Sequence, residues 1–267
     1  MQSYQHLSIV KEGAIDWLTL NRPAQFNAFD FPLAYELQHY LRQLERDGSV
    51  RVVVLRGAGK HFCAGMDLKE ALGSDVGGGV DRALERQRSI GDVMVLLRRI
   101  PQPVIALVQG AASGAGFALM LAADVRYAAR GARMNVAMAK IGLTGCDIGI
   151  SYHLTRSLGE SVASELMLTG RFIDAERAER LGLVSGVVDE SDLEATGRAL
   201  AQEMLAVAPT GLRLTKECIR FALDAPSLEA VVAMEDRQQV VCTSTADYRE
   251  GVSAFLGRRP PRFGSAS

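Results

Sequence analysis

Cysteine and histidine are scarce in this sequence, with four residues of each among 267. The cysteines lie far apart, form no Cys-x-x-Cys pair and have no histidine at ligand spacing; they are Cys63, Cys146, Cys218 and Cys242. A disulfide framework is typically a closely spaced, even set of cysteines, and a zinc site needs Cys or His ligands at short spacing. The sequence therefore predicts neither a disulfide-stabilised fold nor a metal site.

The chain also lacks an excess of charge of either sign and any sustained run of like charges. Thirty basic residues stand against 31 acidic ones, which leaves a formal net charge of −1. Because nucleic acids and anionic membrane surfaces attract basic patches, neither is predicted as a partner. The segment Met1 to Lys11 has no basic stretch followed by an apolar run, so we expect no secretory signal and a cytoplasmic location.

One stretch without charge has the length of a membrane span. From Val104 to Ala123, twenty residues follow one another without a charged side chain. The interior of this stretch, Gln109 to Gly116, consists mostly of small, turn-forming residues. Such residues suit a buried strand, a tight loop and a buried helix start better than a helix facing lipid. We therefore predict no membrane segment.

Strand and helix patterns alternate over the first two thirds of the chain. With 48% hydrophobic residues, the sequence can fill a large core. A β-branched run that ends at Gly57 predicts a fully buried strand, and leucines at helical spacing follow the capping residue Asp30. Strands are expected over residues 14–20, 51–57, 104–108, 125–128 and 184–188, and helices after Asp30, over 80–99, after Gly114 and over 174–181.

The last third of the chain reads as helical. Helix starts are predicted at Ser191, which forms a capping box with Glu194, at Ser227 and at Thr245. No strand is predicted after Val188. We therefore expect a mixed α/β core over residues 1–190 and a helical C-terminal region over residues 191–267.

Two segments are rich in small residues, which allow a backbone to approach a ligand or another segment closely. We refer to residues 61–69 as the first loop and to residues 109–117 as the second loop. Each follows a predicted buried strand, and α/β sheets bind ligands at the carboxyl ends of their strands. A helix that begins near Ala115 would direct free N–H groups towards this place, which suits an oxyanion. The alternative is that the glycines only permit tight helix packing.

Asp147 is the lone acid in a small and apolar segment, residues 141–152. Burial of this kind raises the pKa of a carboxyl group and suits it to proton transfer. The alternative is a structural one, because Asp often caps a helix, and a helix is expected to begin near Gly149.

Several motifs in order along the chain identify it as similar to a known family. The motifs are Asn21-Arg22-Pro23 with Asn27-Ala28, residues 62–68, residues 110–116, residues 166–171 with 175–178 and 181–184, and residues 255–260. Together they resemble the enoyl-CoA hydratase/isomerase, or crotonase, superfamily.

The resemblance implies a spiral of ββα units with a C-terminal helical region that builds homotrimers, often paired into homohexamers. It implies an acyl-CoA thioester substrate whose enolate is stabilised by the backbone N–H groups of Met66 and Ala115. Coenzyme A would enter as part of the substrate, with no separate cofactor. The residues implied in substrate binding are Ala64, Gly65, Asp67, Leu68, Lys69, Gly114, Ala118 and Met138, with Lys69 near a CoA phosphate.

The sequence departs from the hydratases of the family at two positions. Hydratases carry two glutamates there, whereas this chain has Ala118 and Met138, neither of which can transfer a proton. Asp147 matches the acid that isomerase-like and dehalogenase-like relatives carry, if one extra residue is allowed after Gly142. We therefore expect proton transfer by Asp147, as in double-bond isomerisation or a modified hydration. The alternatives are thioester hydrolysis, C–C bond cleavage, or a catalytically silent CoA-binding protein.

Overall fold

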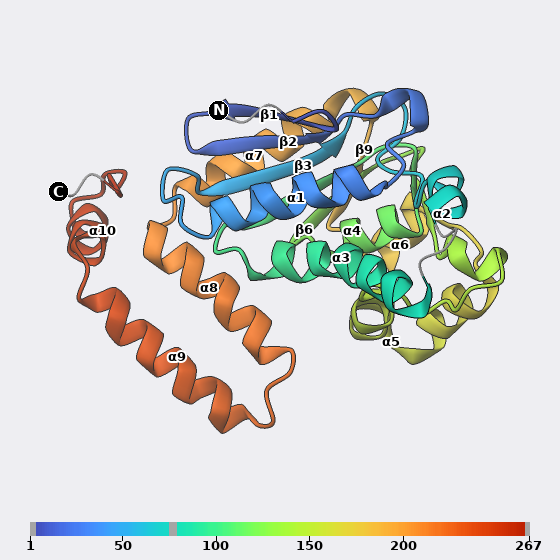
Figure 1. Cartoon of the computed structure of the whole chain (residues 1–267). Coiled ribbons are helices and arrows are strands. Elements are labelled where there is room, and N and C mark those ends of the chain that lie inside the picture. Colours follow the sequence, from blue (N-terminus) through green and yellow to red (C-terminus); the bar gives the residue numbers. More distant parts are fainter. Residues whose placement is uncertain (1–3, 75–78, 265–267) are drawn as a thin grey trace.

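The computed structural model describes residues 4–74 and 79–264, which form two sheets with helices around them (Figure 1). The larger sheet has six strands in the order β1-β2-β3-β4-β6-β9. The strands are β1 (Leu7–Glu12), β2 (Ile15–Leu20), β3 (Val52–Gly57), β4 (Val104–Val108), β6 (Val125–Ala129) and β9 (Gly186–Val188). Only β1 and β2 pair in antiparallel fashion among these neighbours. The predicted α/β class is thereby confirmed, and the five predicted strands correspond to β2, β3, β4, β6 and β9, whereas β1 was not predicted.

The smaller sheet is built from three short strands, β5 (Ala111–Ser113), β7 (Arg133–Asn135) and β8 (Ile173–Asp174). Of these, β5 directly follows β4 and β7 directly follows β6 of the larger sheet, while β8 follows a helix. β5 comes after β4 and leads into helix α4 (Ala115–Ala122), which makes a ββα unit with one strand in each sheet. The second loop is therefore no irregular connection, because it contains β5 and the start of α4.

Helices cover both faces of the larger sheet. Alternate residues of β3 point to opposite sides, so that Val53 and Leu55 join the main core while Val52 and Val54 join a smaller one. The main core is covered by α1 (Phe31–Leu44), α3 (Gly79–Arg99) and α4. The smaller core is covered by α7 (Leu193–Leu205), which contacts β3, β4 and β6. Burial on both faces explains the uninterrupted apolar run of β3.

The predicted helix starts at Asp30, Ser227 and Thr245 are confirmed by side-chain caps, whereas the one at Ser191 is wrong. The Asp30 carboxylate accepts a hydrogen bond from the Leu33 N–H at 2.8 Å, and Ser227 and Thr245 cap α9 and α10 in the same way. The expected capping box at Ser191 is absent because residues 190–192 form a 3₁₀ turn, and α7 begins at Leu193 without a side-chain cap.

The remaining helices are one that begins in the first loop, two between β7 and β9, and three at the C-terminal end of the chain. They are α2 (Leu68–Ser74), α5 (Ile150–Thr169), α6 (Ala175–Arg180), α8 (Pro209–Ala222), α9 (Leu228–Thr243) and α10 (Ala246–Leu256), with 3₁₀ turns at Pro23–Gln25 and Ala137–Lys140. The sequence has a glycine-rich segment over residues 73–79, and its residues 75–78, with Gly77 and Gly78, lie outside the described residues.

The C-terminal helices α8, α9 and α10 extend away from the sheets (Figure 1). None of the residues in α9 is buried. The division expected after residue 190 stays a prediction, and α7 contacts the same sheet as the residues before it, so the extended helices begin at Pro209. Within the described part of the chain, no helix is both long and apolar enough to cross a membrane.

Candidate active site

Hydrogen bonds between backbone atoms hold the two loops side by side. The Cys63 N–H donates to the carbonyl of Ala111 at 3.0 Å, and the Ser113 N–H donates to the carbonyl of Cys63 at 3.0 Å. These bonds form a parallel bridge between Cys63 and Ala112. The two predicted segments, although about fifty residues apart in sequence, are therefore joined as adjacent strands would be.

Glycines make this close approach possible. Gly65 has φ +103°, and a Cβ atom there would lie 2.9 Å from the carbonyl oxygen of Ser113. Gly114 adopts φ 50° and ψ −115°, a conformation that essentially only glycine reaches. A Cβ on Gly116 would lie 2.2 Å from the Cys63 carbonyl oxygen. The glycines therefore do permit tight packing, as the alternative interpretation of these loops expects. The same packing places the backbones of Met66 and Ala115 at one cavity.

Met66 and Ala115 present backbone N–H groups that lack a hydrogen-bond partner among the described residues. Ala115 is the first residue of α4, where the N–H groups of a helix have no intrahelical acceptor and the helix dipole is positive. Both residues line the same cavity. Two free donors beside one cavity form the arrangement that stabilises a developing oxyanion.

The cavity has a volume of about 600 Å³ and a mostly apolar wall. It lies between the two loops, α3 and the segment before α5. Its lining includes eight of the predicted site residues: Ala64, Gly65, Met66, Leu68, Gly114, Ala115, Met138 and Asp147. The structure therefore brings together residues that span more than eighty positions of the chain.

The other three predicted site residues do not line this cavity. Ala118 is buried inside α4, with 1% of its surface exposed. The Asp67 carboxylate faces Arg22 and forms an ion pair with it at 3.2 Å. Lys69 is exposed on α2. Of the two positions that the sequence analysis matches to the hydratase glutamates, Ala118 thus lies in the core and Met138 places its thioether side chain at the cavity wall.

The Asp147 carboxyl is half-buried and faces the cavity from the segment before α5. Its Oδ1 atom accepts a hydrogen bond from the Gln87 amide at 2.5 Å, and the backbone N–H of Ile148 also donates to this carboxyl. Burial raises the pKa of Asp147, and the two hydrogen bonds oppose that rise because they favour the charged form. Ile148 has φ +37°, an uncommon conformation for a β-branched residue, so the backbone is strained beside this carboxyl.

The alternative role of Asp147 as a helix cap is wrong. α5 begins at Ile150, its N-cap residue is Gly149, and no side chain caps it. The Ile150 N–H bonds to the backbone carbonyl of Asp147 at 2.8 Å, not to the carboxylate. The side chain is therefore free of a capping role.

The sequence interpretation missed the wall that α3 contributes. Val80, Ala83, Leu84, Gln87 and Ile90 all line the cavity. Their spacing of three or four residues places them on one face of the helix, which is the signal that could have found them. In the described part of the chain, no cluster of three or more His, Cys, Asp or Glu residues could hold a metal ion.

Comparison with known proteins assigns the fold and the family. Residues 10–266 match the family model described as "Enoyl-CoA hydratase/isomerase". The crystal structure of an enoyl-CoA hydratase from Bacillus anthracis superposes with a TM-score of 0.92 and 33% identity, covering 98% of this chain and 100% of that one. The chain belongs to the enoyl-CoA hydratase/isomerase family and has the crotonase fold, as the motifs predict.

Two relatives of this chain are named for different reactions, one as a hydratase and the other as an isomerase. The chain is 42% identical over 250 residues to "Probable enoyl-CoA hydratase EchA12" of Mycobacterium tuberculosis, covering 92% of this chain and 88% of that one. It is 39% identical over 258 residues to "1,2-epoxyphenylacetyl-CoA isomerase" of Escherichia coli, covering 96% and 97%. The protein is thus a hydratase/isomerase-type enzyme that acts on acyl-CoA.

Proposed function

We propose that this enzyme moves a carbon–carbon double bond within the acyl chain of a CoA thioester, with Asp147 as the proton carrier. One observation carries the proposal. Among the described residues that line the cavity, Asp147 is the only one with a carboxylate side chain. The positions matched to the hydratase glutamates hold Ala118 and Met138. A single carboxylate can move one proton between two carbons, whereas water addition in these hydratases uses two.

The proposed reaction needs no atom from outside the substrate and Asp147. The carboxylate takes a proton from C2 of a 3-enoyl thioester, and the electrons of that C–H bond move into the thioester as a dienolate forms. The N–H groups of Met66 and Ala115 donate to the thioester oxygen, which gains negative charge at this stage. The Asp147 carboxyl then returns the proton to C4, so that the double bond ends between C2 and C3.

The surroundings of Asp147 support this role. Because burial raises the pKa of the carboxyl, its charged form is a stronger base than a solvated aspartate and can hold the proton between the two transfers. The relative from Escherichia coli is named an isomerase, which is the same broad class of reaction. The Met138 side chain at the wall offers no donor or acceptor suited to placing a water molecule for hydration.

The rest of the substrate would follow the first loop out of the cavity. We propose that coenzyme A lies along residues 64–69, that Lys69 approaches a phosphate, and that no other cofactor takes part. The C-terminal helices would assemble three chains, or two such trimers. A cytoplasmic location stays a prediction.

The test is incubation of the enzyme with a panel of 2-enoyl- and 3-enoyl-CoA substrates in deuterated water, followed by analysis of the products. The proposal predicts a moved double bond and deuterium incorporation at C2 or C4. A 3-hydroxyacyl product would indicate hydration, and free coenzyme A would indicate thioester hydrolysis; either one, formed without isomerisation, contradicts the proposal.

A further inference from the structure

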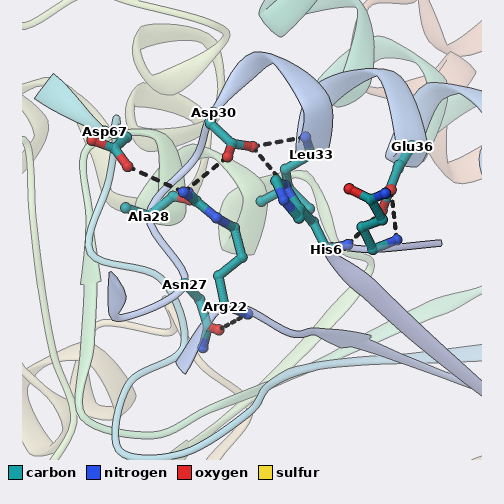
Figure 2. Close-up of polar contacts among 9 residues, drawn as sticks. His6, Arg22, Asn27, Ala28, Asp30, Leu33, Glu36 and Asp67 are labelled. Carbon is teal, nitrogen blue, oxygen red and sulfur yellow. Dashed lines mark hydrogen bonds and ion pairs between the residues drawn. The ribbon is translucent and has the colours of Figure 1, made fainter. Parts of the chain in front are cut away.

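Arg22 belongs to the opening motif of the chain, yet it has no part in the reaction described above. It lies between β2 and the 3₁₀ turn at Pro23–Gln25, and its side chain is 13% exposed. Its Nη2 atom contacts Asp30 Oδ2 at 2.9 Å and Asp67 Oδ2 at 3.2 Å. Its Nη1 atom donates to the carbonyl of Ala28. Figure 2 shows the guanidinium between the two carboxylates.

The two ends of this contact differ in how firmly they are held. Asp30 also accepts hydrogen bonds from the Leu33 N–H at 2.8 Å and from His6 Nδ1 at 3.1 Å (Figure 2). Among the described residues, Asp67 Oδ1 receives one long contact, at 3.5 Å, from the Glu70 N–H. Asp30 is thus held in place at the start of α1, and the Arg22 side chain joins Asp67 to it.

Asp67 directly follows Met66, which lines the cavity. On both sides of Met66 the backbone pairs with Phe29: the Phe29 N–H donates to the Gly65 carbonyl at 2.7 Å, and the Asp67 N–H donates to the Phe29 carbonyl at 2.9 Å. Arg22 therefore holds both strands of the bridge between Phe29 and Met66, one through Asp67 and the other through Ala28 and Asp30.

A second polar side chain of the motif, that of Asn27, holds the opposite end of the first loop. Asn27 is fully buried, and its amide nitrogen donates to the carbonyls of His61 at 2.7 Å and Ala58 at 2.9 Å. Its Oδ1 atom accepts a hydrogen bond from the Arg22 N–H at 2.9 Å (Figure 2). The turn that carries Arg22 and Asn27 therefore contacts the first loop near both of its ends, at His61 through Asn27 and at Asp67 through Arg22.

We propose that Arg22 is a positioning residue for the oxyanion donor Met66, an inference that rests on the proposed function of that N–H group. With Arg22 removed, the Asp30 and Asp67 carboxylates stand near each other without their shared cation. Like charges repel, and the more weakly held Asp67 moves. The adjoining Met66 N–H then no longer points at the thioester oxygen. A displacement of this N–H group by about 1 Å is enough to reduce turnover strongly.

The experiment compares Arg22→Met, which keeps the length of the stem but removes the charge, with Asp67→Ala and the control Arg98→Met. Arg98 forms a comparably buried ion pair with Asp124 at 3.2 Å, away from the cavity and both loops. Two quantities are measured: kcat and KM for the 3-enoyl-CoA with the fastest turnover, and the infrared carbonyl stretch of bound trans-2-hexenoyl-CoA labelled with ¹³C at the thioester carbon.

In the wild-type enzyme the oxyanion donors lower the carbonyl stretching frequency of the bound thioester. We expect Arg22→Met and Asp67→Ala to lose much of this shift and to lower kcat roughly 10- to 100-fold, with KM changed less than about threefold. Arg98→Met lowers the melting temperature but keeps the carbonyl shift and kcat. A purely structural role of Arg22 would lower the melting temperature and leave the carbonyl shift of the folded protein intact.

The outcomes separate this inference from the proposed function. A folded Arg22→Met enzyme with wild-type kcat and a wild-type carbonyl shift overturns the role of Arg22 while the oxyanion hole stands. If Arg22→Met fails to fold, Asp67→Ala decides the matter by the same two criteria. A wild-type enzyme that leaves the carbonyl frequency of the bound thioester unchanged overturns the oxyanion hole, and the role of Arg22 with it.

Discussion

Opposing effects act on the carboxyl of Asp147. Partial desolvation disfavours its charged form, whereas the hydrogen bonds from Gln87 and from the Ile148 N–H favour it. Arg86 is the other charged residue that lines the cavity in the described structure. The amide of Gln87 thus has two effects, because it limits the rise in the pKa and fixes the direction of the carboxylate.

The first prediction follows from the hydrogen bond of Gln87. Proton abstraction needs the charged form of Asp147, so kcat/KM rises as the pH rises through the pKa of this group. Gln87→Leu removes a bond to the charged form, raises the pKa, and moves this rise in kcat/KM to higher pH. Glu85→Gln, on the exposed side of α3, is the control and keeps the wild-type profile. A profile of Gln87→Leu that coincides with the wild-type one contradicts this account.

Sequence reasoning identified Asp147 but missed Gln87, for a physical reason. An isolated acid in an apolar segment is visible in the local sequence. The contact with Gln87 joins positions sixty residues apart, and only the packing of α3 beside the segment before α5 creates it. Arg22 was visible as part of a motif, but its partner Asp67 is likewise brought to it by the fold.

The N–H of Ala115, at the start of α4, is the proposed oxyanion donor that a substitution can test most cleanly. The first position of a helix tolerates proline, because its N–H makes no intrahelical bond. Ala115→Pro therefore removes the donor without breaking α4, and we expect kcat to fall by roughly 10²- to 10³-fold. Ala115→Gly keeps the N–H and is the control, with a much smaller change. Normal kcat in a folded Ala115→Pro variant would place the oxyanion hole elsewhere.

Helix α8 is fastened to the core by a buried lysine. Lys216 is 8% exposed, and its ammonium group contacts Asp124 Oδ2 at 2.8 Å and the carbonyl of Gln102 at 2.8 Å. Lys216→Met leaves the carbonyl and part of the Asp124 carboxylate unpaired, which costs about 2 kcal/mol of the free energy of unfolding. Urea unfolding monitored by circular dichroism measures this loss. An unchanged midpoint would show that the contacts of Lys216 contribute no net stability.

At the scale of helices and strands, the sequence predicted an element correctly where one residue pattern fits only one structure. The valine run of β3 is buried on both faces, and the pattern predicts that directly. The residues at Ser191 fit a capping box as well as they fit a 3₁₀ turn. Residues 190–192 form the 3₁₀ turn, and α7 therefore begins at Leu193. Competing turn geometries that use the same residue types cannot be separated by sequence spacing alone.

The extended C-terminal helices expose a large amount of apolar surface for a single chain. In α9 and α10, large apolar side chains that are more than two-thirds exposed include Leu228, Val240, Phe255 and Leu256. A stable monomer does not normally leave such patches in contact with water. We therefore expect sedimentation to show trimers or hexamers of the 28.8 kDa chain. Phe255→Asp should shift this distribution towards smaller species, and a wild-type monomer at micromolar concentration would contradict the assembly.

The whole molecule was predictable as an α/β protein from its alternating patterns, but its strand order was not. β9 pairs with β6 although nearly sixty residues separate them, and β5 leaves the main sheet immediately after β4. Such arrangements depend on long-range packing that no local pattern records. The ordered family motifs predicted the crotonase fold, and the family match together with the superposition confirms it.

The central claim is that Asp147 carries the proton, and Asp147→Asn tests it most directly. Asparagine keeps the size of the side chain but cannot accept and return a proton. We expect turnover of a 3-enoyl-CoA in deuterated water to fall by about 10²- to 10⁴-fold, with loss of deuterium incorporation. Binding of the CoA thioester should persist, because we propose that the two loops provide most of the affinity. Near-wild-type turnover of the Asp147→Asn enzyme on the same substrate would contradict the account.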